Sequence, residues 1–156
     1  MPKTYWMVVQ TPENFQISKT HGFTVHGLRS RYRRRVQRME PEDLVLFYIS
    51  GIRKWGAITK ITSRYFKDRE PIWRAVDYDD NFPYRVKMKP NIILEEKDYI
   101  DAMEIGPRLE YVKRWIPERW QLAFHDSLHL LPQRDFRLIE GEMKRIISRR
   151  KRWRDR

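Results

Sequence analysis

The chain has 156 residues, enough for one ordinary domain but not for two independent hydrophobic cores, and its 13% of aromatic residues argues against disorder. It contains no cysteine, which excludes disulfides, cysteine-based zinc sites and thiol nucleophiles, and no apolar run reaches the roughly 20 residues of a membrane-spanning helix. The formal net charge of +12 indicates a polyanionic partner, and without a signal-peptide pattern near the N-terminus we expect a compact, soluble, cytoplasmic protein.

The first half of the chain is expected to be rich in strands. Residues 5–9 form a short β-rich apolar run, and the following Thr11-Pro12-Glu13-Asn14 is typical of a helix start, with Thr11 as N-cap and Gly22 as a later stop. The arginine-rich segment 29–38 shows no clean apolar period, so we expect a loop there. Further strands are predicted at residues 44–49, 55–61 and 82–89.

The second half is expected to be helical. Short helices are predicted at 98–103 and 107–115, and the strongest helical pattern covers 132–150. Its apolar stripe, which should dock on the sheet, consists of Phe136, Ile139, Met143, Ile146 and Ile147. These elements predict an α+β fold, a small, curled, mostly antiparallel sheet flanked by helices. We expect a single domain at 1–143 and a basic C-terminal helical extension at 144–156.

The positive charge is concentrated in two segments. Residues 29–38 carry a net charge of +6 and residues 144–156 carry +7, so that the remainder of the chain sums to −1. Both segments prefer Arg over Lys, and a guanidinium can bind phosphate through two parallel hydrogen bonds and stack on a base. An acidic protein or an anionic lipid surface would also suit such charge. The predicted phosphate-binding residues are Arg29, Arg31, Arg33, Arg34, Arg35, Arg149, Arg150 and Arg152.

Signatures of catalysis are scarce. His125 and His129 are four residues apart, but the Glu of a metalloprotease helix and a third ligand are both missing, so we expect no metal. Ser50 lies outside any nucleophile elbow, and the scattered glycines form no phosphate-binding loop, so we name no catalytic residue and no cofactor. If the protein were an enzyme, Asp68 would be the first candidate for a perturbed carboxylate, and its simpler role is that of a turn or cap residue.

A series of short motifs spaced over most of residues 5–140 matches one known family. The motifs are YWMVV (5–9), PENF (12–15), HGFTV (21–25), MEPEDLVLFY (39–48), GAI (56–58), YFKD (65–68), FPYRV (82–86), RW (119–120) and LPQRDF (131–136). Together they resemble the EVE domain, a member of the PUA-like superfamily and a relative of the YTH readers of methylated adenine. The resemblance implies a curled sheet in a pseudo-barrel, and recognition of a modified or flipped base in a concave pocket rather than a reaction.

The same resemblance implies which residues form that pocket. By similarity to the YTH pattern, Asn14 would contact the base edge and Trp73 would be a stacking wall. Many relatives carry Gly-x-Trp where this chain has Gly22-Phe23-Thr24, so Phe23 or Trp55 would have to replace the wall that Thr24 cannot provide. The implied pocket residues are Gln10, Thr11, Asn14, Phe23, Thr24, Ser50, Gly51, Trp55 and Trp73.

The charge pattern and the resemblance together predict a nucleic-acid-binding module. RNA or DNA would be held by arginine contacts to phosphates, while a plain or modified nucleobase enters the pocket. Two alternatives stay open: an RNA-modifying or nucleobase-processing enzyme that uses the same pocket, and an adaptor whose basic tail docks on an acidic protein.

Overall fold

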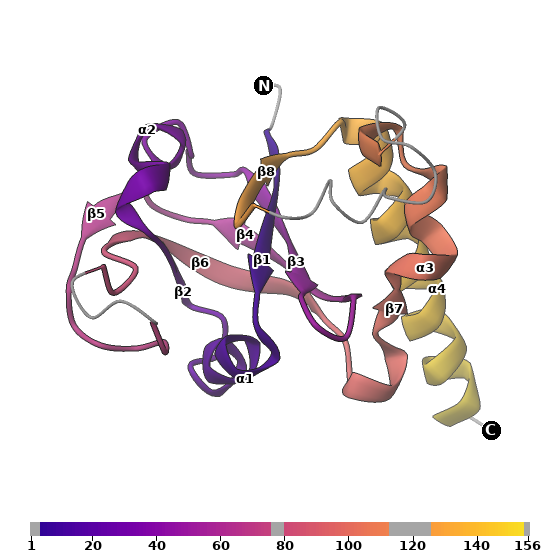
Figure 1. Cartoon of the computed structure of the whole chain (residues 1–156). Helices are drawn as coiled ribbons and strands as arrows, with labels where there is room; N and C mark the ends of the chain where they lie inside the picture. Colours follow the sequence, from indigo (N-terminus) through magenta and orange to yellow (C-terminus); the bar gives the residue numbers. More distant parts are fainter. Residues whose placement is uncertain (1–3, 76–79, 113–125, 155–156) are drawn as a thin grey trace.

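The computed structural model describes residues 4–75, 80–112 and 126–154, and within them the chain folds around one curled sheet of eight strands (Figure 1). The main strand order is β2-β6-β4-β3-β1-β8, with β5 paired to β6 and β7 paired to β4. Strands β1 and β3 are parallel, and the other recorded pairs are antiparallel. The strands are β1 (Tyr5–Gln10), β2 (Val25–Leu28), β3 (Leu44–Ile49), β4 (Lys54–Ile61), β5 (Phe66–Lys67), β6 (Tyr84–Ile93), β7 (Ile100–Asp101) and β8 (Leu128–Leu130). The α-helices are α1 (Pro12–Thr20), α2 (Arg33–Val36), α3 (Ala102–Ile105) and α4 (Gln133–Arg154).

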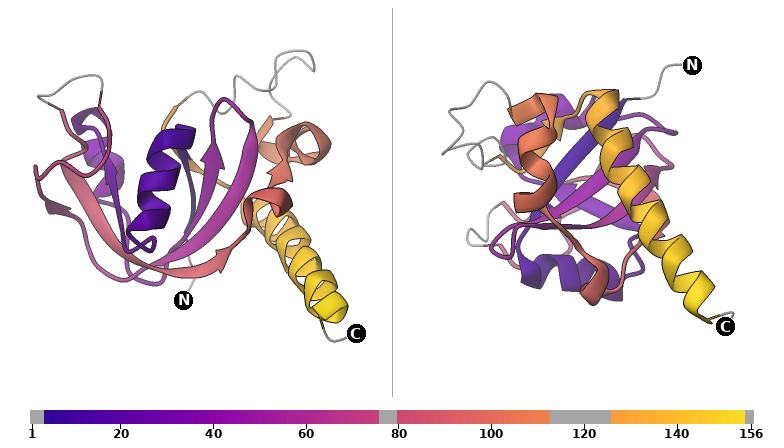
Figure 2. Two further views of the ribbon diagram at one scale, coloured as in Figure 1. Left: turned by 90° about the horizontal axis from the view of Figure 1, so that it is seen from below. Right: turned by 90° about the vertical axis from the view of Figure 1, so that its right-hand side faces the viewer.

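The central strands are buried on both faces, which explains their continuous apolar sequences. Along β1, Trp6 and Val8 pack into one hydrophobic cluster, while Met7 between them packs into a second cluster on the other face of the sheet. Phe15 of α1 joins the first cluster, and Phe136 of α4 joins the second. Helix α1 therefore lies inside the curl of the sheet and α4 lies outside it (Figure 2). The expected curled sheet flanked by helices is confirmed, as a half-barrel of mixed strand direction.

The start of α1 follows the sequence-based expectation. The side chain of Thr11 accepts a hydrogen bond from the backbone N–H of Asn14 at 3.1 Å, and Pro12 occupies the first turn. The chain leaves the helix through Gly22, whose φ of +71° suits a residue without Cβ. The N-terminus of α1 is thus fixed directly after the last residue of β1.

The arginine-rich segment is not the loop that we expected. A 3₁₀ turn at Ser30–Tyr32 runs into α2. Tyr32, Val36 and Met39 are buried between the exposed arginines, at spacings of four and three residues. Three apolar residues are too few for a visible period in the sequence, but they suffice to dock this short helical segment on the core.

The later elements differ from expectation in detail. The region expected to be a helix at 98–103 contains a 3₁₀ turn (Glu96–Asp98), β7 and α3. The helix expected at 107–115 is replaced by 3₁₀ turns at Gly106–Arg108 and Glu110–Val112, and residues 113–115 lie outside the described part of the chain. Helix α4 buries Phe136, Ile139 and Met143, whereas Ile147 is 42% exposed because the helix projects past the sheet (Figures 1 and 2). No helix among the described residues has the length and apolar character to cross a bilayer.

Candidate functional site

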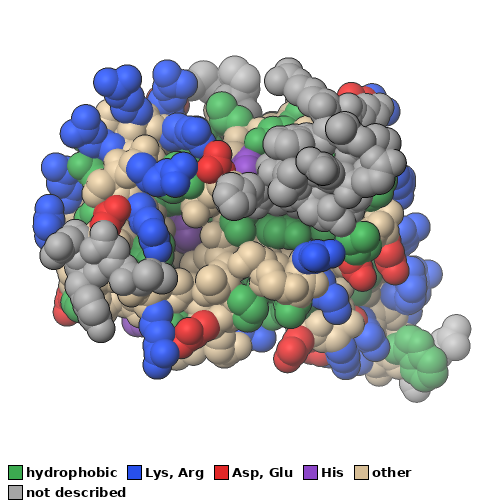
Figure 3. Space-filling model, viewed as in Figure 1, with side chains coloured by type: hydrophobic (Ala, Val, Ile, Leu, Met, Phe, Trp, Pro, Cys, Tyr) green, Lys and Arg blue, Asp and Glu red, His purple; other side chains and the backbone are tan. Residues whose placement is uncertain are grey.

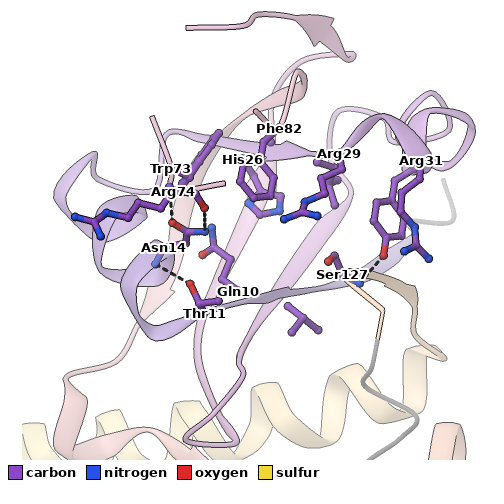
Figure 4. A pocket seen from close by; sticks show the side chains of 14 residues that line it. Gln10, Thr11, Asn14, His26, Arg29, Arg31, Trp73, Arg74, Phe82 and Ser127 are labelled. Atoms are coloured by element: carbon purple, nitrogen blue, oxygen red, sulfur yellow. Dashed lines mark hydrogen bonds between the residues drawn. The ribbon is translucent and has the colours of Figure 1, made fainter. Parts of the chain in front are cut away.

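A cavity of about 200 Å³ opens where the curled sheet does not close, between the edge strand β2 and the end of β1. Its walls come from β1, the N-terminus of α1, β2, the start of the arginine-rich segment, the loop before β6, and Ser127 beside β8 (Figure 4). Arginine is the only charged residue type among the described residues that line it, because none of them is Asp or Glu. The cavity therefore suits a neutral or anionic ligand.

Asn14 holds one wall of the cavity in place. Its side-chain amide donates to the backbone carbonyl of Arg74 at 3.0 Å, and its side-chain oxygen accepts from the backbone N–H of Arg74 at 2.9 Å. This pair joins the first turn of α1 to a loop 60 residues later in the chain (Figure 4). Asn14 is 7% exposed, and these two hydrogen bonds fix the conformation of its side chain. One role of Asn14 is to position the loop that carries Trp73.

Trp73 forms the aromatic wall of the cavity and is 5% exposed. Its indole N–H donates to the hydroxyl of Ser18 at 2.9 Å, and its ring meets the ring of Phe82 edge-on at 6.0 Å. Gly27 of β2 lies against it, because a Cβ at this position would come within 2.6 Å of both Cζ3 of Trp73 and the carbonyl oxygen of Phe82. The indole is thus held rigidly against a strand that leaves it just enough space.

Arg85 supports the same loop from below, which the sequence pattern did not indicate. The alternation of residues 84–89 places Arg85 and Lys87 on the same face of the strand, yet Arg85 is 1% exposed whereas Lys87 is exposed. The Arg85 guanidinium donates to the carbonyls of Phe82 at 3.0 Å and of Glu70, and it lies 5.3 Å from the Trp73 ring. Burial lowers the pKa of Arg85, while the Asp68 carboxylate, 3.5 Å away, raises it. The loop carbonyls and the Asp68 carboxylate therefore take the place of the water molecules that would solvate the Arg85 guanidinium in an unfolded chain.

Arginines stand around the mouth of the cavity. Arg29 lies over the ring of Phe82 at 5.5 Å, and Arg31 lies over the ring of Tyr32 at 5.0 Å. Arg31 also approaches Asp126 at 3.3 Å. The phenol oxygen of Tyr32 accepts from the backbone N–H of Ser127 at 3.0 Å, which joins the arginine-rich segment to the β8 side of the opening. Figure 3 shows Lys and Arg side chains gathered over this end of the molecule.

The other predicted phosphate-binding arginines fall into two groups. Arg33 and Arg34 are exposed on α2, beside the cavity, while Arg35 donates to the carbonyl of Leu128 at 2.9 Å. The second group lies on the projecting end of α4, at the opposite end of the molecule (Figures 1 and 2). There Arg149 and Arg152 are exposed, and Arg150 forms an ion pair with Asp98 at 2.7 Å.

The structure brings four of the nine predicted pocket residues together around the cavity. These are Gln10, Thr11, Asn14 and Trp73. Phe23 and Trp55 lie in the hydrophobic clusters instead, 2% and 0% exposed, because each completes the packing of the central sheet. The other aromatic residues that line the cavity are Tyr32 and Phe82, which were not among the predicted pocket residues.

The remaining predicted pocket residues do not line the cavity. Thr24 is exposed, and its hydroxyl donates to the carbonyl of His21 at 2.9 Å. Ser50 donates through its backbone N–H to the carbonyl of Gln10 at 2.8 Å, and Gly51 follows in a turn against Pro12. Ser50 and Gly51 therefore support the backbone at the end of β1.

The residues weighed for catalysis have other contacts. His129 bonds through its ring nitrogens to the Tyr111 hydroxyl at 2.7 Å and the Asp126 carbonyl at 2.6 Å, and His125 lies outside the described residues. No group of three metal-ligating side chains occurs in the part of the chain that the structure describes. Asp68 accepts from the backbone N–H of Glu70 at 2.9 Å and pairs with Arg85, as a turn residue does.

Comparisons with known proteins agree with this architecture. Residues 4–123 match the family described as the EVE domain. A UPF0310 protein from Pyrococcus horikoshii is 27% identical over 148 residues, which cover 88% of this chain and 97% of that protein. Two solved structures show a similar fold. The YTH domain of Mmi1 in complex with RNA has a TM-score of 0.67 at 11% identity, covering 95% of this chain and 85% of that one. Human THYN1 in complex with 5-methylcytosine containing DNA has a TM-score of 0.62 at 17% identity, covering 90% and 98%. Since the family match spans most of its length, this chain belongs to the EVE domain family.

Proposed function

We propose that this protein binds nucleic acid, holding one nucleobase in the cavity between β1 and β2 while the surrounding arginines contact phosphates. The observation that carries the proposal is that an aromatic wall, hydrogen-bonding side chains and arginines all meet at one cavity. A cavity with an aromatic wall and hydrogen-bonding side chains is lined by Arg29, Arg31 and Arg74 and by no described carboxylate. Phosphate contacts would supply affinity independent of sequence, and the cavity would select the base.

The cavity has the parts that hold a planar base. Trp73 offers an indole that is fixed by Ser18, Gly27 and Phe82, so little side-chain freedom is lost when a ring stacks on it. Stacking of one base on an aromatic side chain contributes about 1–3 kcal/mol. Mmi1 and human THYN1, which share the fold, were solved with RNA and with DNA containing 5-methylcytosine. A modified base is therefore the first ligand to test here.

The basic surface beside the cavity has the chemistry of a phosphate-binding site. Arg33 and Arg34 are exposed on α2, and Arg29 and Arg31 are oriented by stacking on aromatic rings. Oriented guanidinium groups lose less conformational freedom when they bind phosphate. The enzymatic alternative had Asp68 as its candidate carboxylate. Asp68 does not line the cavity, and it pairs with Arg85 and accepts from the backbone N–H of Glu70 as a turn residue does.

The test is a fluorescence anisotropy titration with RNA and DNA oligonucleotides that carry one plain or modified base, repeated at two salt concentrations. We expect Arg34→Gln to lower affinity for all of them and to reduce the slope of log K against log salt by about 0.7–0.9, the contribution of one phosphate contact. The control is Arg108→Gln, which removes an exposed arginine from the α3 side of the molecule. Equal effects of the two variants, or equal affinity for every base tested, would refute the proposal.

A further inference from the structure

Two buried polar atoms at the cavity, one from His26 and one from Gln10, have no hydrogen-bond partner. His26 of β2 is 3% exposed, its Nδ1 has no partner, and its ring forms no hydrogen bond with any residue of the described part of the chain. Gln10 at the end of β1 is 7% exposed, and its side-chain Oε1 also lacks a partner. Both residues line the cavity, on neighbouring sides of the space seen in Figure 4.

Neighbouring side chains are already engaged and leave these atoms unsatisfied. The Ser18 hydroxyl accepts from Nε2 of Gln10 at 3.0 Å and from the Trp73 indole at 2.9 Å. The Asn14 amide is paired with the backbone of Arg74. Nearly all buried polar atoms in folded proteins have a hydrogen-bond partner. Two exceptions that line one cavity therefore indicate a partner that comes from outside the chain.

We propose that Gln10 and His26 read the hydrogen-bonding edge of an uncharged nucleobase, which must donate an N–H to Oε1 of Gln10 and form a second hydrogen bond with the imidazole of His26. This inference rests on the proposed function and specifies its ligand. A side-chain amide oxygen only accepts, so the bound base must present a donor there. A neutral imidazole has one donor and one acceptor nitrogen, so the second contact takes either kind of group.

The electrostatics of the cavity disfavour a cationic base. Burial lowers the pKa of His26 to about 3, so its ring is neutral at physiological pH. The charged groups that line the cavity are Arg29 and Arg31 after β2 and Arg74 on the loop, and no described lining residue is a carboxylate. A base that carries a positive charge through methylation of a ring nitrogen would find no carboxylate among the described lining residues, since Glu13 and Asp126, which lie outside that lining, already pair with Arg74 and Arg31. The ligand class is therefore a neutral base whose inserted edge carries a free N–H.

The experiment compares pairs of oligonucleotides that differ, at a single position, by one hydrogen-bond donor group on the base edge, either an amino group or a ring N–H. Cytosine is paired with its analogue lacking the 4-amino group, adenine with purine, guanine with hypoxanthine, and uracil with 3-methyluracil. For at least one pair, the protein should bind the intact base about 10- to 100-fold more tightly, since an unmatched buried acceptor rejects a ligand that lacks the donor. Gln10→Met should reduce that ratio to near 1, whereas Gln16→Met, on the exposed face of α1, should leave it unchanged.

A measurement on the unmodified chain tests His26 without a variant. The ring ¹⁵N resonances of His26 should shift when the oligonucleotide with the preferred base binds, and should stay in place when the same strand with an abasic site at that position binds. Unchanged resonances, or a ratio that survives in Gln10→Met, overturn this inference while base selection by the cavity stands. Absence of any binding at low salt overturns the proposed function, and this inference with it.

Discussion

Replacing Arg85 with methionine should release the loop that carries Trp73. The guanidinium is 1% exposed and makes two strong contacts to loop carbonyls, those of Phe82 and Glu70. A hydrogen bond from a charged group contributes about 1.5–3 kcal/mol, so we expect the loss of these two to lower the free energy of unfolding by roughly 3–6 kcal/mol at most, since both are only part-buried. Asp68 adds little to this loss, because its side chain is 42% exposed and water can replace the ion pair. The methionine side chain keeps most of the apolar packing, so the loss reports the hydrogen bonds.

Urea unfolding followed by circular dichroism and tryptophan fluorescence measures this effect. Lys87→Met is the matched control, because Lys87 is two residues along the same strand and is exposed, and surface substitutions usually change stability by less than about 0.5 kcal/mol. Base discrimination should fall in Arg85→Met and persist in Lys87→Met. Similar unfolding free energies for the two variants would show that Arg85 does not hold the loop.

Three further predictions concern the cavity and α4. The pKa of His26 is about 3 in the folded protein, against an ordinary value of 6.5. Between pH 3 and pH 6.5 the unfolded chain therefore binds a proton on this ring and the folded protein does not. In that range the free energy of unfolding should fall on acidification by up to about 1.4 kcal/mol per pH unit. Urea titrations from pH 4 to 7 should show that His26→Phe removes this part of the slope, and an unchanged slope would contradict the assignment. Gly27→Ala should displace Trp73 and lower base discrimination. The comparison variant Gly141→Ala has open space around the added Cβ and should raise the free energy of unfolding by about 0.5–1 kcal/mol. Unaltered base discrimination in Gly27→Ala would argue against a fixed indole wall. Arg149→Gln should weaken the binding of long strands and spare short ones in anisotropy titrations, and equal losses for both lengths would place its contact beside the cavity.

The sequence predicted the elements that have strong local signals. Strands β1 and β3 were clear because both faces of each are buried, which leaves continuous apolar runs. The start of α1 was clear because Thr11 and Pro12 carry the chemistry of a helix N-terminus. Strand β6 was located correctly, but alternation shows only which side chains share a face, so it did not reveal that Arg85 is buried. The loop residues that contact Arg85 lie within 68–75 and 80–82, and strand alternation carries no information about a covering loop.

The same limit applies to the cavity. Gln10 and Asn14 were found through the resemblance, and the structure places both there. Trp55 was expected at the cavity because an aromatic ring can serve either a core or a binding site, and composition does not separate these uses. His26 was missed because a lone histidine in a β-rich stretch is ordinary. What distinguishes it is the absence of a described hydrogen-bond partner, which depends on the packing of its ring against Phe47 of β3 and against Trp73.

The placement of the two arginine groups constrains how a strand can bind. Of the two arginine groups, only the one in the segment 29–38 lies at the cavity, where Arg29 and Arg31 line it. A short oligonucleotide with its base in the cavity would therefore reach this group and not the one on α4, which lies at the opposite end of the molecule (Figure 1). On α4, Arg150 and Arg154 are held by Asp98 and Glu95, while Trp153 is 72% exposed. A basic surface with an exposed aromatic ring is typical of single-strand contacts that do not select sequence. Under the proposed function, base selection and strand retention would therefore fall to opposite ends of the molecule, and the second would become effective only for a strand long enough to reach both.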